Sequence, residues 1–461
     1  MQTNIASTGI SSTGKGLFGI SLTAALAGFI FGFDTVVISG ADKPIQALWH
    51  TSPWFHGFFI MSMALWGTVV GALFGGVPTQ KYGRKKVLIW IGILFTVSAI
   101  GSALAPNPYV FSFFRFIGGL GIGVSSVAAP TYISEISTAS SRGRLVAMYQ
   151  FNIVFAILLA YISNYLLKGI GGPNDWRWML GVMAIPSFIY SILVLGIPES
   201  PRWLITKDRD NDARNVLSKL GVTNANEEIA AIKNGIQHEN IGGKEIEFFS
   251  KKHKTILALA FFIAFFNQFS GINFILYYAP RILERAGLAS NDSLLSSIII
   301  GGTNLVFTFV GLYLIDRLGR KILLLIGSVG YIISLGAVAW CFYIHASANL
   351  LVTFLAMFIA SHAIGQGAVI WVFISEIFPN KIRAAGQSFG AGTHWVCAAF
   401  ITLISPVFID ENSGILKDNP WPIFAFFSFM MVLQLIWVIT KVPETKGRSL
   451  EQIQKDLGID Y

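Results

Sequence analysis

Six polar side chains interrupt an apolar segment that begins near residue 255. They are Asn267, Gln268, Ser270, Asn273, Tyr277 and Tyr278. An amide both donates and accepts hydrogen bonds, so several amides around one cavity suit an uncharged ligand with many hydroxyl groups. Gly271 and Pro280 in the same stretch weaken a helix. Within a bilayer, a broken helix is tolerated only where protein or a wet cavity covers its backbone, so we expect this stretch to line a cavity.

A second chemical feature is a pair of opposite charges inside apolar segments. Asp34 lies deep in the first such segment, and Arg115 lies in the fourth. One charge at the centre of a membrane helix costs about 2.5–3.5 kcal/mol, so we expect the two to face each other. The pair could be permanent and structural. Alternatively, water entering from one side and then the other would change the solvation of the carboxyl group, which could then bind and release a proton.

The composition places these groups in a membrane. Of 461 residues, 54% are hydrophobic and 12% are charged, whereas soluble domains carry roughly 25% charged residues. The mean hydropathy is +0.63. The net charge of +9 comes mainly from short loops, which is typical of membrane topology and not of nucleic-acid binding. Cys341 and Cys397 both lie in apolar segments, so we interpret them as packing residues and not as a disulfide.

Long apolar runs predict an all-α membrane protein with twelve transmembrane helices. The predicted spans are 17–40, 55–79, 86–105, 109–134, 144–167, 178–197, 255–286, 292–315, 321–344, 349–377, 384–409 and 420–440. We divide the chain into an amino-terminal six-helix half (1–198), a linker with short amphipathic helices (199–254), a carboxy-terminal six-helix half (255–441) and a tail (442–461).

Basic residues predict the orientation of the spans. Four connections are rich in them: Lys81, Arg84, Lys85 and Lys86; Arg142 and Arg144; Arg317, Arg320 and Lys321; Lys381 and Arg383. The linker and the tail are also rich in lysine. Because loops rich in lysine and arginine stay on the cytoplasmic side, we place both termini, the linker and these four connections in the cytoplasm. We expect a multi-pass protein of the plasma (inner) membrane, embedded in the lipid bilayer and working as a monomer.

The two halves carry similar motifs at nearly the same offset. Gly83-Arg84-Lys85 recurs as Gly319-Arg320-Lys321, and Ile133-Ser134-Glu135-Ile136 recurs as Ile374-Ser375-Glu376-Ile377. Pro198-Glu199 has a looser counterpart in Pro443-Glu444. Such a repeat predicts two pseudo-symmetric halves that rock about a site near the bilayer midplane.

These motifs, in this order, resemble the sugar porter family of the major facilitator superfamily. The other motifs of the resemblance are Arg115-Phe116-Ile117-Gly118-Gly119, Pro130-Thr131-Tyr132-Ile133-Ser134-Glu135, Pro198-Glu199-Ser200-Pro201-Arg202, Ser375-Glu376-Ile377-Phe378-Pro379 and Pro443-Glu444-Thr445-Lys446-Gly447. The match covers nearly the whole chain. It implies the major facilitator fold and transport of a monosaccharide by alternating access.

The resemblance also implies which residues contact the sugar. The matching positions are Gln150, Asn267, Gln268, Asn273, Asn304, Trp371, His394 and Trp395, with Phe31 as an apolar wall. A tryptophan face stacks on the C–H face of a sugar ring. For each amide taken alone, a structural bond between helices is the alternative. Gln268 and Asn273 are five residues apart, so only a helix break would let both aim at one ligand.

Two positions, one in the tenth span and one in the eleventh, depart from the family pattern, and two tyrosines of the seventh span resemble a gate. His394 stands where relatives carry an amide, and Ala368 stands where many carry proline, so we expect a softer kink in the tenth span. Tyr277 and Tyr278 resemble the residues that close the outer end.

Charges at the cytoplasmic ends of spans form a predicted ion-pair latch. Its members are Arg84, Glu135, Arg142, Arg320, Glu376 and Arg383. We expect ion pairs between the halves when the cytoplasmic side closes, since the positive-inside pattern by itself needs no glutamate. The alternative is that all six are solvated charges.

The predicted function is secondary active import of a monosaccharide, a hexose or pentose such as glucose or xylose, by proton symport. In the family an aspartate at position 34 marks proton-coupled members, so Asp34 would carry the proton and Arg115 would modulate it. The alternatives are a proton-independent sugar uniporter and a sugar sensor on a transporter scaffold. The sequence predicts no enzymatic activity, no cofactor, no metal site and no nucleic-acid partner.

Overall fold

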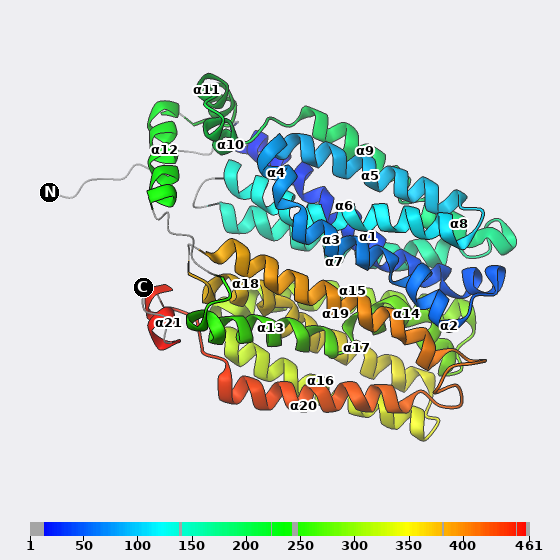
Figure 1. Ribbon diagram of the computed structural model, residues 1–461. Coiled ribbons are helices and arrows are strands. Elements are labelled where there is room, and N and C mark those ends of the chain that lie inside the picture. Colours follow the sequence, from blue (N-terminus) through cyan, green and yellow to red (C-terminus); the bar gives the residue numbers. More distant parts are fainter. Residues whose placement is uncertain are drawn as a thin grey trace.

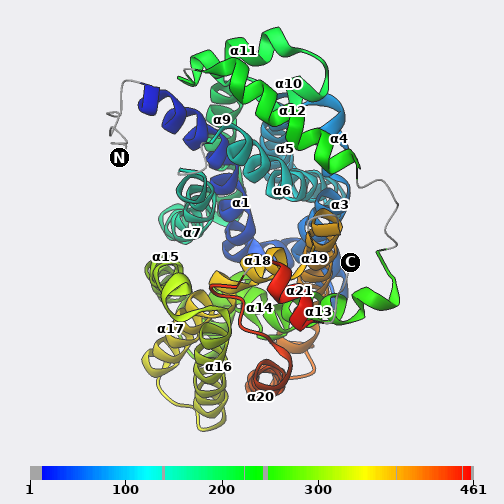
Figure 2. The same ribbon diagram turned by 90° about the vertical axis from the view of Figure 1, so that its left-hand side faces the viewer.

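The protein is a bundle of long helices arranged in two groups. The computed structural model describes residues 13–137, 141–222, 224–241, 248–379, 382–448 and 450–457. The helices before residue 197 and those between residues 254 and 441 form two groups that lie side by side (Figure 1). Helices α10, α11 and α12 lie over the first group and α21 lies over the second, all at the same end of the bundle (Figure 1 and Figure 2). We call this the linker end, and we call the opposite end the far end.

The first group is built mainly from apolar helices joined by short turns. It contains α1 (Thr13–Trp49), α2 (Pro53–Phe55), the π-helix η1 (His56–Met61), α3 (Met63–Phe74), α4 (Gly76–Tyr82), α5 (Arg84–Leu104), α6 (Pro108–Ile136), α7 (Arg142–Leu167), the 3₁₀ helix η2 (Gly172–Asn174), α8 (Asp175–Gly181) and α9 (Ala184–Gly196). The linker that follows forms α10 (Pro201–Thr206), α11 (Asp210–Lys219) and α12 (Ala225–Ile241).

The second group repeats this plan. It contains the 3₁₀ helix η3 (Lys251–His253), α13 (Lys254–Phe269), α14 (Ile272–Arg285), α15 (Ser290–Leu318), α16 (Arg320–Tyr343), α17 (Ala348–Ile364), α18 (Gln366–Ile377), α19 (Arg383–Ile409) and α20 (Trp421–Lys441). The short helix α21 (Leu450–Asp456) follows.

Twelve membrane crossings emerge if one bent pair is counted as a span. Within the described residues, eleven helical segments are long and apolar enough to cross a bilayer. The pair Pro53–Met61 and Met63–Phe74, bent by 43°, makes the twelfth. The predicted spans therefore agree with the structure to within a few residues, except for the first. That span was expected to end near residue 40, but α1 continues to Trp49, because the charges that follow residue 40 are paired with the second group.

Two spans of the second group are broken. Between α13 and α14, Gly271 adopts the left-handed conformation (φ +84°, ψ 14°). Between α17 and α18, Gly365 leaves the helical region (φ −86°, ψ −101°), and a Cβ added there would lie 2.8 Å from the Cα of Gly327. The tenth span thus breaks at Gly365, three residues before Ala368, the position where many family members carry proline. Despite the break, α17 and α18 form one membrane crossing.

The two groups also pack along their flanks. Helix α3 lies against α19, and α7 lies against α15. A Cβ added to Gly57 would approach the carbonyl oxygen of Leu403 to 1.9 Å. The rings of Phe151 on α7 and Phe309 on α15 have centroids 5.6 Å apart. Small residues allow this close approach of backbones where no water drives association.

Replacing Gly271 with alanine should destabilise the protein. The left-handed conformation costs a non-glycine residue about 1–2 kcal/mol, and the new Cβ would lie 2.7 Å from the ring of Phe427. Gly302→Ala is the matched control, because nothing lies within 4 Å of its added Cβ. Thermal unfolding in detergent should show a lower Tm for Gly271→Ala and an unchanged or higher Tm for Gly302→Ala. Equal melting of the two variants would contradict the role given to the break.

Candidate functional site

The helix break in the seventh span brings three amides together. Nε2 of Gln268 donates to Oδ1 of Asn267 at 2.9 Å, and Nδ2 of Asn273 donates to Oε1 of Gln268 at 2.9 Å. Gln268 lies in the last turn of α13 and Asn273 in the first turn of α14, so the turn at Gly271 allows side chains five residues apart to meet. All three amides are almost fully buried. The structure thus contains the helix break that these two side chains need in order to meet, and their contact with a sugar stays a prediction.

An aromatic wall adjoins these amides. Nε2 of Gln268 lies 3.2 Å from Nε2 of His394 on α19. The imidazole ring of His394 contacts Trp395 and Trp371, with centroid distances of 4.7 and 5.0 Å. Trp395 in turn contacts Phe31 of α1 at 5.6 Å. Four of the predicted contact residues, His394, Trp371, Trp395 and Phe31, therefore adjoin the amides of the seventh span. Phe31 brings the first group to the same place.

Gln150 and Asn304 lie apart from this hydrogen-bonded set. Gln150 is half-buried on α7 and Asn304 is buried on α15. Among the described residues, the amide network does not extend to either of them. The side chains around Gln268 hydrogen-bond one another. Each amide offers both donors and an acceptor, so the hydroxyl groups of a ligand can replace these bonds with bonds of their own.

Asp34 and Arg115 form an ion pair inside the first group. Nη1 of Arg115 lies 2.5 Å from Oδ1 of Asp34, and both residues are at most 1% exposed. Oδ2 of Asp34 has no hydrogen-bond partner within the described structure. The pair keeps both charges compensated in a low-dielectric interior, while the free carboxylate oxygen leaves one position where a proton can bind.

The two predicted gate tyrosines are buried on α14. Tyr277 is 1% exposed and lies within electrostatic range of Arg115 and Asp34. Tyr278 has non-helical dihedral angles (φ −116°, ψ 16°), and its hydroxyl donates to the carbonyl of Thr402 on α19 at 2.8 Å. The kink at Tyr278 separates the part of the seventh span that carries the amides from the part that reaches the far end.

At the linker end, the two halves repeat one arrangement of charges. Arg84 makes a bidentate contact with Glu135, at 2.7 and 2.8 Å, and Arg320 makes the same contact with Glu376, at 2.7 and 3.1 Å. Glu199 accepts from the backbone N–H groups that begin α5, and Glu444 accepts from those that begin α16. A carboxylate at a helix N-terminus accepts hydrogen bonds from the free N–H groups and interacts favourably with the positive end of the helix dipole.

The ion-pair latch was expected to join the two halves, whereas in this structure its arginine–glutamate pairs lie within each half. Arg84 and Arg320 each pair within their own half, because the glutamate of each motif ends a helix that neighbours the helix begun by the arginine. The Nε of Arg383 faces the carbonyl of Phe378 at 3.4 Å. Arg142 begins α7, but its side chain lies outside the described part. Pairing between halves in another conformation stays a prediction.

Comparison with known proteins identifies the family. The sequence model described as "Sugar (and other) transporter" matches residues 20–457. The chain belongs to the sugar transporter family. The predicted family is therefore confirmed.

Named relatives cover almost the whole of this sugar transporter. The arabinose–proton symporter of Bacillus subtilis is 34% identical over 447 residues, which are 95% of this chain and 94% of that protein. The D-xylose–proton symporter of Escherichia coli is 32% identical over 95% of each chain. The galactose–proton symporter of E. coli is 34% identical over 95% of this chain and 94% of that protein.

Solved structures confirm the predicted fold class, an all-α major facilitator fold with two pseudo-symmetric halves. An inward-open conformation of the xylose transporter from E. coli superposes with a TM-score of 0.82 at 31% identity, covering 95% of this chain and 99% of that one. The proton:xylose symporter bound to 6-bromo-6-deoxy-D-glucose superposes with a TM-score of 0.79 at 31% identity, covering 96% of this chain and all of that one.

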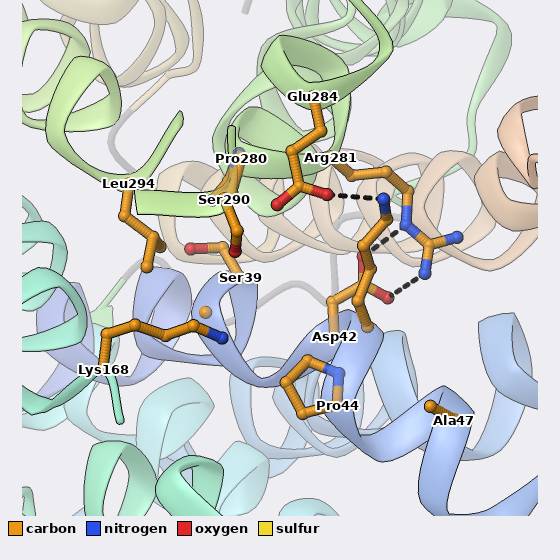
Figure 3. A pocket seen from close by; sticks show the side chains of 12 residues that line it. Ser39, Asp42, Pro44, Ala47, Lys168, Pro280, Arg281, Glu284, Ser290 and Leu294 are labelled. Carbon is orange, nitrogen blue, oxygen red and sulfur yellow. Dashed lines mark hydrogen bonds and ion pairs between the residues drawn. The ribbon is translucent and has the colours of Figure 1, made fainter. Parts of the chain in front are cut away.

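The structure also reveals a charged cluster at the far end of the transporter, which sequence analysis missed. Arg281 on α14 pairs with Asp42 on α1, at 2.7 Å between Nε and Oδ2, and Nε2 of His56 lies 2.8 Å from Oδ1 of Asp42. Lys43 pairs with Glu284 and with Glu411. Asp42, Lys43, Arg281 and Glu284 line a cavity of about 280 Å³ between the two groups (Figure 3). The sequence does place these charges at the ends of apolar spans, where a charge needs a partner. It does not show which charges pair with each other.

Asp410 completes this far-end cluster. It accepts from Nε2 of Gln46 at 2.9 Å and lies 3.8 Å from Nη1 of Arg281. Burial by itself would raise the pKa of the Asp410 carboxyl, but hydrogen bonds from Ser413, Gln46 and Asn412 outweigh burial and hold that pKa below its ordinary value. The carboxylate therefore stays ionised and keeps the far ends of α1 and α14 linked to the end of α19.

Removing one partner of the buried far-end pair should cost much more than removing an exposed one. Asp42→Asn leaves the charge of Arg281, which is 3% exposed, with Asp410 at 3.8 Å as its remaining ion-pair partner among the described residues, and breaking a buried pair costs about 3–5 kcal/mol. Lys43→Met removes two pairs, with Glu284 and Glu411, whose lysine side chain is 35% exposed, each worth about 0–1 kcal/mol. Thermal unfolding in detergent should show a larger loss of Tm for Asp42→Asn. An equal or smaller loss would show that the buried pair is not what stabilises this end.

Proposed function

We propose that this protein imports a monosaccharide together with a proton by alternating access. The observation that carries the proposal is the juxtaposition of two features in a sugar transporter. One is a buried amide and aromatic cluster around Gln268, which suits a ligand with many hydroxyl groups. The other is the buried Asp34–Arg115 pair, with one free carboxylate oxygen. Relatives named as arabinose–, xylose– and galactose–proton symporters support the same reading.

We further propose that the linker end faces the cytoplasm and that the structure represents an inward-facing state. The basic connections at the linker end support this orientation. The far-end contacts of Asp42, Lys43 and Gln46 with the second group support closure on the outside. The likeness to an inward-open xylose transporter is consistent with this state. In the proposed cycle, the halves 1–198 and 255–441 rock as units, and the ion-pair latch joins them when the cytoplasmic side closes.

Proton coupling would act through the charge balance of Asp34. While Asp34 is ionised, it pairs with Arg115. When external water reaches the pair, a proton can bind the free oxygen, and the neutral carboxyl weakens its hold on the arginine. Sugar bound between Phe31, Gln150 and the amides of the second half would then be enclosed as the halves rock. Proton release on the cytoplasmic side restores the pair, so the inward proton gradient drives accumulation.

The central test is uptake by proteoliposomes containing the purified transporter. Arabinose, xylose, galactose and glucose should be offered as competitors against one labelled sugar, with and without an inward proton gradient. We expect at least one pentose or hexose to compete, accumulation above equilibrium only with the gradient, and alkalinisation of the medium on sugar addition. Equilibration that is indifferent to the gradient would instead establish the uniporter. Absence of labelled-sugar counterflow for all four sugars would overturn the sugar-import proposal.

Asp34→Asn should separate coupling from sugar movement. Asparagine keeps the shape of the side chain but cannot take up a proton, so proton-driven accumulation should fall to the equilibrium ratio while counterflow stays within about threefold of the wild type, since counterflow needs no net proton transfer. The control is Asp292→Asn, which neutralises an exposed acid at the start of α15. Accumulation that persists in Asp34→Asn would remove this residue from the coupling mechanism.

Gln268→Ala should weaken sugar binding. A typical hydrogen bond contributes about 0.5–1.5 kcal/mol, so losing one or two bonds to sugar should raise KM about 5- to 10-fold while the maximal rate changes little. Asn152→Ala is the control, because the amide of Asn152 bonds the carbonyl of Met148 in its own helix. Initial uptake rates over a range of sugar concentrations provide the comparison. Similar KM values for Gln268→Ala and the wild type would exclude Gln268 from the binding site.

A further inference from the structure

The kink in the seventh span leaves one backbone carbonyl without its helical partner. Pro280 lies inside α14, and proline has no N–H to donate to the carbonyl four residues earlier. That carbonyl belongs to Leu276, which is 6% exposed. A buried backbone carbonyl without a hydrogen bond costs about 1–3 kcal/mol, so the position needs another donor whenever it is closed off from water.

The donor comes from the opposite half of the transporter. The hydroxyl of Tyr161, on α7, donates to the carbonyl oxygen of Leu276 at 2.8 Å. Tyr161 is fully buried, and its ring packs against Gly301 of α15, where an added Cβ would lie 2.9 Å from the ring. The residue therefore touches both α14 and α15 of the second half while it belongs to the first.

We propose that Tyr161 is a positioning residue for the outer gate, and that its hydroxyl holds the kinked end of α14 in the closed position by capping the carbonyl freed at Pro280. This inference rests on the proposed alternating-access cycle. When the outer side opens, α14 moves away from α7 and external water hydrates the Leu276 carbonyl. The bond to Tyr161 thus stabilises the closed outer gate and contributes little to the open one.

The location of this bond suits a gate. Leu276 and Arg281, five residues apart on α14, contact two different helices of the first half. Leu276 accepts from Tyr161 of α7, and Arg281 pairs with Asp42 of α1. The Tyr161 bond therefore lies on the same segment of α14 as the far-end charge cluster.

The same chain contains a matched bond that does not cross between halves. Pro406 inside α19 frees the carbonyl of Thr402, and the hydroxyl of Tyr278 donates to that carbonyl at 2.8 Å. Both tyrosines are buried, and both cap a carbonyl freed by proline. Tyr278 is itself a predicted gate residue, so the control for the loss of a capping hydroxyl is Tyr132 of α6, which is buried and donates to the carbonyl of Pro198 within the first half at 2.8 Å.

The test measures the opening of the far end in spin-labelled protein. Cysteines introduced at Ala47 and Ser290, which are exposed on opposite halves beside the far-end cavity, carry the labels in a background with Cys341→Ser and Cys397→Ser. Pulsed electron spin resonance reports the distance between the labels in nanodiscs without sugar. Tyr161→Phe should raise the ratio of open to closed far ends about 5- to 10-fold, as expected for one lost hydrogen bond. Tyr132→Phe should leave the ratio within about twofold of the background protein, because its bond joins two parts of one half.

A double substitution tests the role of the freed carbonyl. Pro280→Ala supplies an N–H that can bond the Leu276 carbonyl within α14, so the Tyr161 hydroxyl becomes dispensable. We expect Tyr161→Phe to change the ratio less than twofold in the Pro280→Ala background. An unchanged ratio in Tyr161→Phe alone would overturn the proposal. An equal effect of Tyr161→Phe with and without Pro280 would overturn the assignment to this carbonyl.

Transport supplies a separate readout. A larger outward-facing population should lower the external half-saturation concentration and slow the return step, so KM and the maximal rate should both fall in Tyr161→Phe. Tyr132→Phe should not show this joint change. Because the distance measurement uses no sugar, it remains decisive if the uptake assays fail to find a transported sugar. Failure of sugar uptake and failure of the outer-gate role are therefore distinguishable.

Discussion

A charge inside a bilayer has to be paired, and the architecture of this transporter depends on that constraint. Asp34 and Arg115 compensate each other within the first half, whereas Asp42 is compensated by Arg281 from the second half. The first pair can persist while the halves move. The second has to separate if the far end opens, and its charges must then be hydrated by water. The same physical requirement thus produces a pair within one half, which is the proposed coupling element, and a contact between the halves at the far end.

Backbone groups obey the same requirement as charges. The breaks at Gly271 and Gly365 and the prolines at 280 and 406 interrupt helices where lipid cannot supply hydrogen bonds. The freed carbonyls of Leu276 and Thr402 are satisfied by tyrosine hydroxyls. The break at Gly271 also turns Gln268 and Asn273 toward each other. Local weakness in the helix therefore creates both the amide cluster around Gln268 and the kinked end of α14, the proposed outer gate.

The linker end shows how an internal repeat becomes structure. In each half an arginine at the start of one helix contacts a glutamate at the end of another, and a second glutamate caps the N-terminus that begins with the arginine. These contacts fasten helices within each half. In the proposed cycle, the contacts that join the halves at the far end change while the interior of each half stays intact.

The sequence by itself determined the fold class, the number of crossings, the repeat and the family, because apolar length and motif order are local properties of the chain. It also indicated that Asp34 would face Arg115 and that Gln268 and Asn273 needed a helix break to meet. Only the tertiary structure decided which partners close the far end, why α1 continues past Asp42, and that Arg84 and Arg320 pair within their own halves. These are choices among several charges of suitable sign, and they depend on which helices pack as neighbours in three dimensions.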